Sequence, residues 1–196
     1  IRLLTFLFTI YVVRKLGDST YGQYLTALAL TGMFGILFEL GTTQYLERTV
    51  AQQRSRLNEL LPRVIGVRLV LAFAGIFLVT GLAVLLGYDR IIVLSVLLLT
   101  ISYISAALLY PLQTVFTSHE RFDLWTSTLL IGQVLTMILG FLVLWLGGGL
   151  VWFLTTGMVV MPIQILYCWF AIRRLTDIGD VDLRPRLKEI KPLLVS

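Results

Sequence analysis

Charged side chains are scarce in this chain of 196 residues. Asp, Glu, Lys and Arg together make up 14 % of it, whereas hydrophobic residues make up 58 %. Ordinary soluble domains are about 25 % charged. A soluble protein this apolar could not cover its surface with polar groups. The composition therefore argues against a water-soluble domain and for a protein whose surface meets lipid.

Cysteine and histidine are almost absent, with one of each in the chain, Cys168 and His119. A lone cysteine inside an apolar stretch excludes a disulfide framework and indicates a packed or lipid-facing thiol. The sequence has no Cys/His metal spacing, no glycine-rich phosphate loop after a strand and no nucleophile elbow. His119 lies beside Glu120 in a short polar segment, where a solvated side chain is the simplest interpretation. We therefore predict that the protein is not an enzyme and has no catalytic residues, metal or cofactor.

Charge is missing entirely between Asp123 and Arg173, a run of 49 residues. A straight helix of that length would span roughly 73 Å, more than twice the bilayer's hydrocarbon core of about 30 Å. Three glycines, Gly147 to Gly149, lie in the middle of the run. We expect the chain to turn there, so that each half forms one helix of membrane length. The run therefore indicates a polytopic membrane protein.

Six hydrophobic segments follow from the uncharged runs. They are rich in Leu, Ile, Val and Phe without alternating at period two, so we predict α-helices rather than barrel strands. Pro111 is expected to kink or end the fourth helix, and Pro162 lies inside the sixth. The predicted fold is an all-α, polytopic transmembrane helix bundle. Its helices are expected at about residues 3–13, 24–43, 64–86, 91–110, 124–146 and 150–172.

The two ends of the chain carry shorter segments. The uncharged run Leu3–Val13 is too short to span a bilayer, and it lacks the basic region and cleavage site of a signal peptide. We expect it to be the second half of a first helix. At the other end, Lys191 and Pro192 are expected to begin a seventh helix.

Basic residues are distributed unevenly between the two sides of the predicted bundle. Twelve fall on one side and three on the other, with Arg68 remaining inside the third helix. By the positive-inside rule, the amino end and the even-numbered loops face the cytoplasm of a multi-pass protein of the cytoplasmic membrane. This asymmetry explains the net charge of +5 better than nucleic-acid binding, so no nucleic-acid partner is expected. The cytoplasmic set is Arg2, Arg48, Arg54, Arg56, Arg63, Arg121, Arg173, Arg174, Arg184, Arg186, Lys188 and Lys191, and the outer set is Arg14, Lys15 and Arg90.

The loops follow from this orientation. The cytoplasmic ones are 44–63, 117–123 and 173–191, and the outer ones are 14–22, 87–90 and 147–149. Gln44–Leu61 mixes charges with apolar residues, and is either an amphipathic helix along the membrane surface or a solvated connector. The tryptophans fall at helix ends, where their rings suit the headgroup level. They are Trp125, Trp145, Trp152 and Trp169.

Two charges fall inside predicted helices. Glu39 lies about a turn before the second helix ends, and Arg68 about a turn into the third, so their depths match. A charge in hydrocarbon costs a few kcal/mol on insertion scales, and we therefore expect the two to pair. They form either an ion or headgroup contact in a central cavity, or a structural pair that can reach the interface. Gln113, Gln133 and Gln164 either line a cavity or form interhelical hydrogen bonds.

Two short motifs resemble a known family. The first turn reads Arg14-Lys15-Leu16-Gly17-Asp18-Ser19-Thr20-Tyr21-Gly22-Gln23-Tyr24, and Glu39-Leu40-Gly41 with Arg48 follows at the end of the second helix. Together they resemble the polysaccharide biosynthesis flippases, O-antigen flippases among them, of the multidrug/oligosaccharidyl-lipid/polysaccharide exporter superfamily. Glu39 stands where that family commonly has Asp, which preserves the charge.

The resemblance implies a two-lobe transporter in which residues 1–196 form the amino-terminal six-helix lobe. Its implied partners are the bilayer, a carboxy-terminal lobe of the same protein and a polyprenyl-diphosphate-linked oligosaccharide, which it moves to the outer leaflet by alternating access. On this basis Arg48 and Arg68 are candidates to meet the diphosphate, because guanidinium groups match phosphate oxygens. Glu39 would orient one of them, while Gln133 and Gln164 are candidates to line the cavity.

Three other functions remain open. A drug/cation antiporter of the same superfamily would need a deep acidic group, for which Glu39 lies close to the cytoplasmic end. A membrane glycosyltransferase or polymerase would need paired carboxylates or a large outer loop, and the predicted outer loops are short. A non-transporting membrane scaffold is the third.

Overall fold

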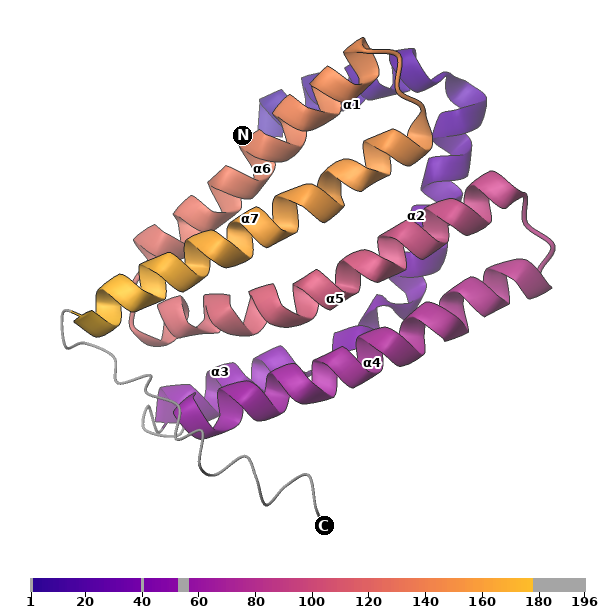
Figure 1. Ribbon diagram of the computed structural model, residues 1–196. Coiled ribbons are helices and arrows are strands. Elements are labelled where there is room, and N and C mark those ends of the chain that lie inside the picture. The colour runs from indigo at the N-terminus through magenta and orange to yellow at the C-terminus, as the bar shows by residue number, and fades with distance from the viewer. Residues whose placement is uncertain (1, 40, 53–56, 178–196) are drawn as a thin grey trace.

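The computed structural model describes residues 2–39, 41–52 and 57–177. Within these ranges the chain is all-helical and contains no strand, so the predicted helix bundle is confirmed (Figure 1). The expected seventh helix near Pro192 lies outside the described residues. The helices are α1 (Arg2–Leu16), α2 (Asp18–Glu39), α3 (Thr42–Gln52), α4 (Leu57–Leu85), α5 (Arg90–Ser118), α6 (Phe122–Trp145) and α7 (Leu150–Asp177).

In the described part of the chain, four helices are long and apolar enough to cross a membrane, namely Glu59–Leu85, Arg90–Ser118, Phe122–Trp145 and Leu150–Arg174. Large apolar side chains such as Phe77 and Leu85 are exposed on the outside of the bundle. That outer surface suits lipid, because an exposed apolar face of this extent would be unstable in water. The protein is therefore a multi-pass membrane protein.

The helix count differs from the sequence-based one, because the described ranges contain seven helices where six were expected. The additional one is α3, which lies in the segment where an amphipathic helix and a solvated connector were both open. Its Leu46 and Val50 are fully buried, while Tyr45 and Arg48 on its other side are exposed. An apolar stripe at this spacing packs a short helix against its neighbours, here α4 and α5.

Several predicted helix bounds were wrong. The second and third helices were expected to begin at residues 24 and 64, but α2 begins at Asp18 and α4 at Leu57. The second helix was expected to reach residue 43, but α2 ends at Glu39, and Gly41 adopts φ +69°, a left-handed conformation that ends helices. The fourth was expected to extend to about Tyr110, with Pro111 kinking or ending it, but Pro111 does not end it, because α5 runs on to Ser118. An interior proline costs about 3 kcal/mol. The residues beyond it offset this, because Val115 and Phe116 are fully buried.

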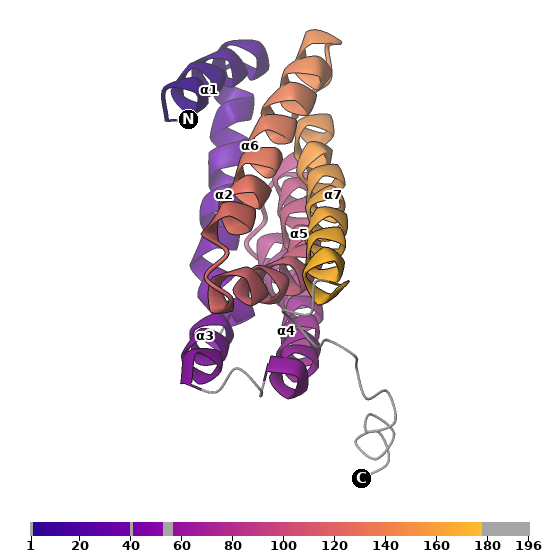
Figure 2. The ribbon, with the colours of Figure 1, turned by 90° about the vertical axis from the view of Figure 1, so that its left-hand side faces the viewer.

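The helix connections divide between the two ends of the bundle (Figures 1 and 2). The turns α1–α2, α4–α5 and α6–α7 gather at one end, and the last of these contains Gly147 at φ +82°, as the glycine triplet predicts. The opposite end, which we call the α3 end, carries α3, the α5–α6 turn and the end of α7. As far as the structure describes them, the two sets of loops inferred from basic residues therefore lie at opposite ends.

Helix α5 is the centre of the packing. It contacts α2, α3, α4, α6 and α7. One hydrophobic core lies between α2, α4 and α5 around Phe38, Val79 and Val96. A second, around Leu46, Phe116 and Cys168, joins α3, α4, α5 and α7 at the α3 end. Both cores depend on α5, so this helix positions whatever α2 and α3 carry.

The approach of α2 to α4 depends on Gly75. A Cβ there would lie 1.9 Å from Cε1 of Phe38. The Phe38 ring has little freedom to move, because it stacks on Tyr103 of α5 with ring centroids 4.0 Å apart. The missing side chain at Gly75 therefore lets three helices meet.

We predict that Gly75→Ala lowers the free energy of unfolding by about 1–3 kcal/mol, the usual cost of overpacking a core. Gly81→Ala on the same helix is the matched control, because nothing lies within 4 Å of the position its Cβ would take. Thermal unfolding of the detergent-purified protein measures both. Equal melting temperatures for the two variants would contradict this account of the α2–α4 contact.

Candidate functional site

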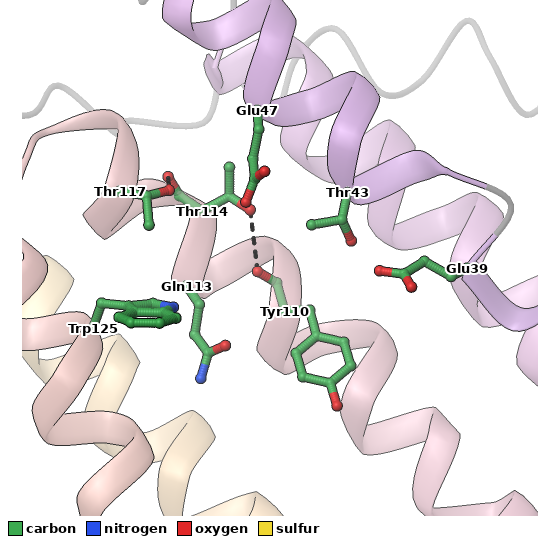
Figure 3. A pocket seen from close by; sticks show the side chains of 8 residues that line it. All are labelled: Glu39, Thr43, Glu47, Tyr110, Gln113, Thr114, Thr117 and Trp125. Carbon is green, nitrogen blue, oxygen red and sulfur yellow. Dashed lines mark hydrogen bonds between the residues drawn. The ribbon is translucent and has the colours of Figure 1, made fainter. Parts of the chain in front are cut away.

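A polar cavity of about 300 Å³ opens at the α3 end of the bundle (Figure 3). The end of α2, the inner face of α3, the last turns of α5 and the first turn of α6 supply its walls. Its lining contains two carboxylates, one amide, several hydroxyls and one indole. The lining residues are Glu39, Thr43, Glu47, Tyr110, Gln113, Thr114, Thr117 and Trp125.

Half of the lining comes from α5. Tyr110, Gln113, Thr114 and Thr117 are spaced i, i+3, i+4 and i+7, which places them on one helix face. The sequence-based fourth helix was drawn only to Tyr110, so these residues were not recognised as one stripe, and Thr114 and Thr117 were not identified as lining residues. The spacing of polar residues beyond Pro111 was the signal that could have revealed them.

The corner between α2 and α3 supplies the acidic wall. Glu39 is the last residue of α2, and Thr43 and Glu47 follow one turn apart on the inner face of α3. Gly41 permits the sharp change of direction. Oγ1 of Thr42 donates a hydrogen bond to the backbone oxygen of Glu39 over 2.6 Å, which satisfies a carbonyl at the end of α2. Figure 3 shows Glu39 and Thr43 on one side of the cavity, facing Gln113 and Trp125 across it.

Arg68 of α4 supports this corner from behind. Its side chain is 4 % exposed, and Nη1 donates a hydrogen bond to Oγ1 of Thr43. Nη2 lies 4.0 Å from Oε1 of Glu39, and the guanidinium carbon lies 5.3 Å from the centre of the Tyr110 ring. The predicted contact between Glu39 and Arg68 is therefore present. All three partners of Arg68 line the cavity, so this arginine joins α4 to the walls formed by α2, α3 and α5.

The ion pair is asymmetric. Glu39 is half exposed, whereas Nε of Arg68 is buried without a hydrogen-bond partner among the described residues. At 4.0 Å and with one partner in contact with solvent, the Coulomb attraction is modest. The burial of Arg68 nevertheless makes the contact matter, because a buried charge without its partner is costly.

The other three residues inferred from the sequence lie elsewhere. Gln164 of α7 is buried, and its Nε2 donates to the backbone oxygen of Thr128 on α6 over 2.9 Å. Nε2 of Gln133 donates to Oγ1 of Thr5 on α1 over 3.3 Å. Both glutamines thus connect helices, the alternative that the sequence left open. Arg48 is exposed on α3, next to the lining residue Glu47.

The lining can accept many hydrogen bonds and carries a net negative charge. Glu47 forms no ion pair with another described residue, so Arg68 offsets only one of the two carboxylates. The amide of Gln113 is 7 % exposed and makes no hydrogen bond within the described part of the chain. In those residues no group of three or more His, Cys, Asp and Glu side chains is placed to hold a metal ion. The arrangement suits a polar organic ligand.

Comparison with known proteins identifies the family. The sequence profile of a family described as "Polysaccharide biosynthesis protein" matches residues 1–195. The chain belongs to this family. No curated protein and no solved structure gives a significant match. The resemblance drawn from the turn motif is therefore confirmed at the level of the family, and the chain is a multi-pass membrane protein of polysaccharide biosynthesis.

We predict a coupling free energy of about 1 kcal/mol between Glu39 and Arg68, above the roughly 0.3–0.5 kcal/mol of exposed helix pairs. Each single replacement by Ala should destabilise the protein. The double replacement should cost less than the sum, because neither charge is then left without its partner. Thermal unfolding of the four proteins in a double-mutant cycle gives this coupling.

Glu59 and Arg63 provide the control cycle, since they form an exposed i,i+4 pair at 3.0 Å on the same helix as Arg68. Strictly additive effects of the replacements at Glu39 and Arg68 would show that the coupling free energy between the two side chains is zero.

Proposed function

We propose that the protein translocates a lipid-linked oligosaccharide across the cytoplasmic membrane by alternating access. Membership of the polysaccharide biosynthesis family supports a role in supplying such precursors. The substrate class fits a membrane bundle with an apolar outer surface, because the lipid part of the substrate can remain in the bilayer while its polar part needs a hydrated path.

The observation that carries the proposal is the position of the polar cavity. It opens at the end of the bundle that also carries Arg63, Arg121 and Arg173. Most basic residues of the described part of the chain lie at this end, and by the positive-inside rule we assign it to the cytoplasmic face. Lipid-linked precursors are assembled from activated sugars, which are found in the cytoplasm. A polar entry site is therefore needed on this side of the membrane.

The proposed transporter has two lobes, of which residues 1–196 are the amino-terminal one. Many transporters bind substrate between two such repeats and expose the site to each side in turn. The cavity at the α3 end would then receive substrate in the inward-open state. The partners of this lobe are the second lobe, the bilayer and a polyprenyl-diphosphate-linked oligosaccharide.

We assign different roles to the two arginines inferred from the sequence. Arg68 is a positioning residue, because its nitrogens hold Thr43 and Glu39 in the cavity wall. Arg48 is exposed on α3, next to the lining residue Glu47, and its side chain can reach a diphosphate at the membrane surface. Gln133 and Gln164 keep the helices in register while the lobe moves.

A drug/cation antiporter is the second candidate, and one observation favours it. Glu47 joins Glu39 in a single cavity, so that two carboxylates can meet a cationic compound there. Neither proposal includes a catalysed reaction.

The proposed orientation predicts cysteine accessibility. In a Cys168→Ser background, Asp18→Cys at the α1–α2 turn should react with a membrane-impermeant maleimide added outside intact cells. Glu120→Cys at the α5–α6 turn should react only after the membrane is opened. Cys168 itself is fully buried, so its removal does not subtract an accessible site. The reverse pattern of labelling would invert the proposed topology.

The proposed transport predicts a defect in living cells. A strain lacking the protein should accumulate lipid-linked glycan on the cytoplasmic leaflet, and the wild-type gene should restore export. Arg68→Gln should restore little. Arg68→Lys should restore more but not all of it, because one ammonium group keeps the charge but does not reproduce the contacts of two guanidinium nitrogens. Arg63→Gln, which removes an exposed charge on the same helix, is the control and should restore export fully.

Leaflet-resolved analysis of labelled lipid-linked glycan, with immunoblots to normalise protein level, measures the outcome. Normal export in the deletion strain together with greater sensitivity to cationic drugs would instead support the antiporter.

A further inference from the structure

We infer that the cavity at the α3 end is a subsite for a neutral or amino sugar of the substrate, and not for its diphosphate. The inference rests on the proposed function, because it assigns one part of the lipid-linked oligosaccharide to one set of side chains. It concerns the residues around Glu47, Gln113 and Trp125.

The charge of the lining argues against an anion. Glu39 is offset by Arg68, but Glu47 is exposed to the cavity without an ion-pair partner among the described residues. The guanidinium of Arg68 contacts Glu39 and Thr43 but is buried and is not among the lining residues. A phosphate or an acidic sugar would therefore meet carboxylate before it met a cation, and like charges repel. A hydroxyl or an ammonium group would instead donate to these oxygens.

The amide of Gln113 points to a hydrogen-bonding ligand. It lines the cavity, is 7 % exposed, and has no hydrogen-bond partner in the described part of the protein. Figure 3 shows it projecting between Trp125 and Tyr110. The polar atoms of this amide are open to the cavity rather than sealed inside the protein, so a ligand hydroxyl can bond both its donor and its acceptor. Sugars present hydroxyls of this kind around the edge of the ring.

The shape and the indole favour a sugar over another polar ligand. A volume of about 300 Å³ is near the lower limit of small-molecule sites, which suits one terminal sugar rather than a whole oligosaccharide. Trp125 adds a flat apolar surface to a lining that is otherwise polar, and its indole N–H is an additional donor. Polar groups on most sides and one apolar face match a sugar ring, whose edges are polar and whose faces are partly apolar.

Saturation-transfer NMR on the intact protein in lipid nanodiscs tests the inference with four probes. They are N-acetylglucosamine, glucosamine, glucuronate and pyrophosphate. We expect the first two to bind at least about tenfold more tightly than the last two, a factor that one unfavourable charge contact readily supplies. Glu47→Gln should reduce the preference for glucosamine over glucuronate, because it removes the unpaired carboxylate.

Trp125 and Glu47 both have exposed side chains, so replacing them is not expected to unfold the protein. Trp125→Ala should weaken sugar binding about fivefold to tenfold, the range of one lost aromatic contact. Trp152→Ala is the matched control at the opposite end of the bundle, where an exposed indole lies outside the cavity. Glu59→Gln is the control for Glu47→Gln, since Glu59 is an exposed carboxylate on α4 that does not line the cavity.

Three results would overturn the inference. One is pyrophosphate or glucuronate binding as tightly as N-acetylglucosamine. Another is sugar binding that Trp125→Ala and Glu47→Gln leave unchanged. The third is the absence of a saturation signal for any sugar. This result overturns the inference even if tetraethylammonium, added as a cation probe, binds in a manner that depends on Glu47.

The leaflet assay separates failure of this inference from failure of the proposed function. If the wild type restores glycan export but replacing Glu47 or Trp125 leaves the affinity for sugars unchanged, the subsite is wrong and the transport proposal stands. If sugar binding depends on Glu47 and Trp125 but the deletion strain exports glycan normally, the subsite stands and the transport proposal fails.

Discussion

The buried guanidinium of Arg68 is the constraint on which the α3 end of this bundle depends. A charge among apolar helices must be satisfied by protein groups, since lipid offers none. Its partners come from three elements, Glu39 of α2, Thr43 of α3 and Tyr110 of α5. One side chain thus holds the α2–α3 corner against α4 and α5. The cavity exists because these helices meet there while their polar side chains point inward.

Helix α5 makes this arrangement possible. It contributes to both hydrophobic cores and then continues past Pro111, where the face that lines the cavity is polar. The buried Phe116 on its far side anchors the last turns, and the stripe from Tyr110 to Thr117 forms the cavity wall. Packing and site therefore share one helix, so a movement of α5 that opened or closed the bundle would also change the cavity.

The family and the cavity describe different levels of function. Membership of the polysaccharide biosynthesis family concerns the whole chain and says nothing of individual side chains. The cavity is specific, with a negative lining, an unpartnered amide and an indole. The resemblance implied that Arg48 and Arg68 meet the diphosphate. The two carboxylates of the lining support the sugar subsite that we propose instead, and Arg48 on the outer side of α3 stays a candidate for the phosphate.

The sequence alone determined the solvent, the helical class and the pairing of two charges. The uncharged run 124–172 predicted two membrane-spanning helices, because buried charge is costly, and its glycines predicted the turn at Gly147. Both signals are local in the chain. The matched depths of Glu39 and Arg68 were enough to predict their contact, because two antiparallel helices bring equal depths together. The tertiary structure alone decided that α5 continues beyond Pro111, that Gln133 and Gln164 connect helices, and that Glu47, Gln113 and Trp125 share one cavity. These depend on the rotation of each helix about its axis, which is set by packing against neighbours and is not encoded within any single segment.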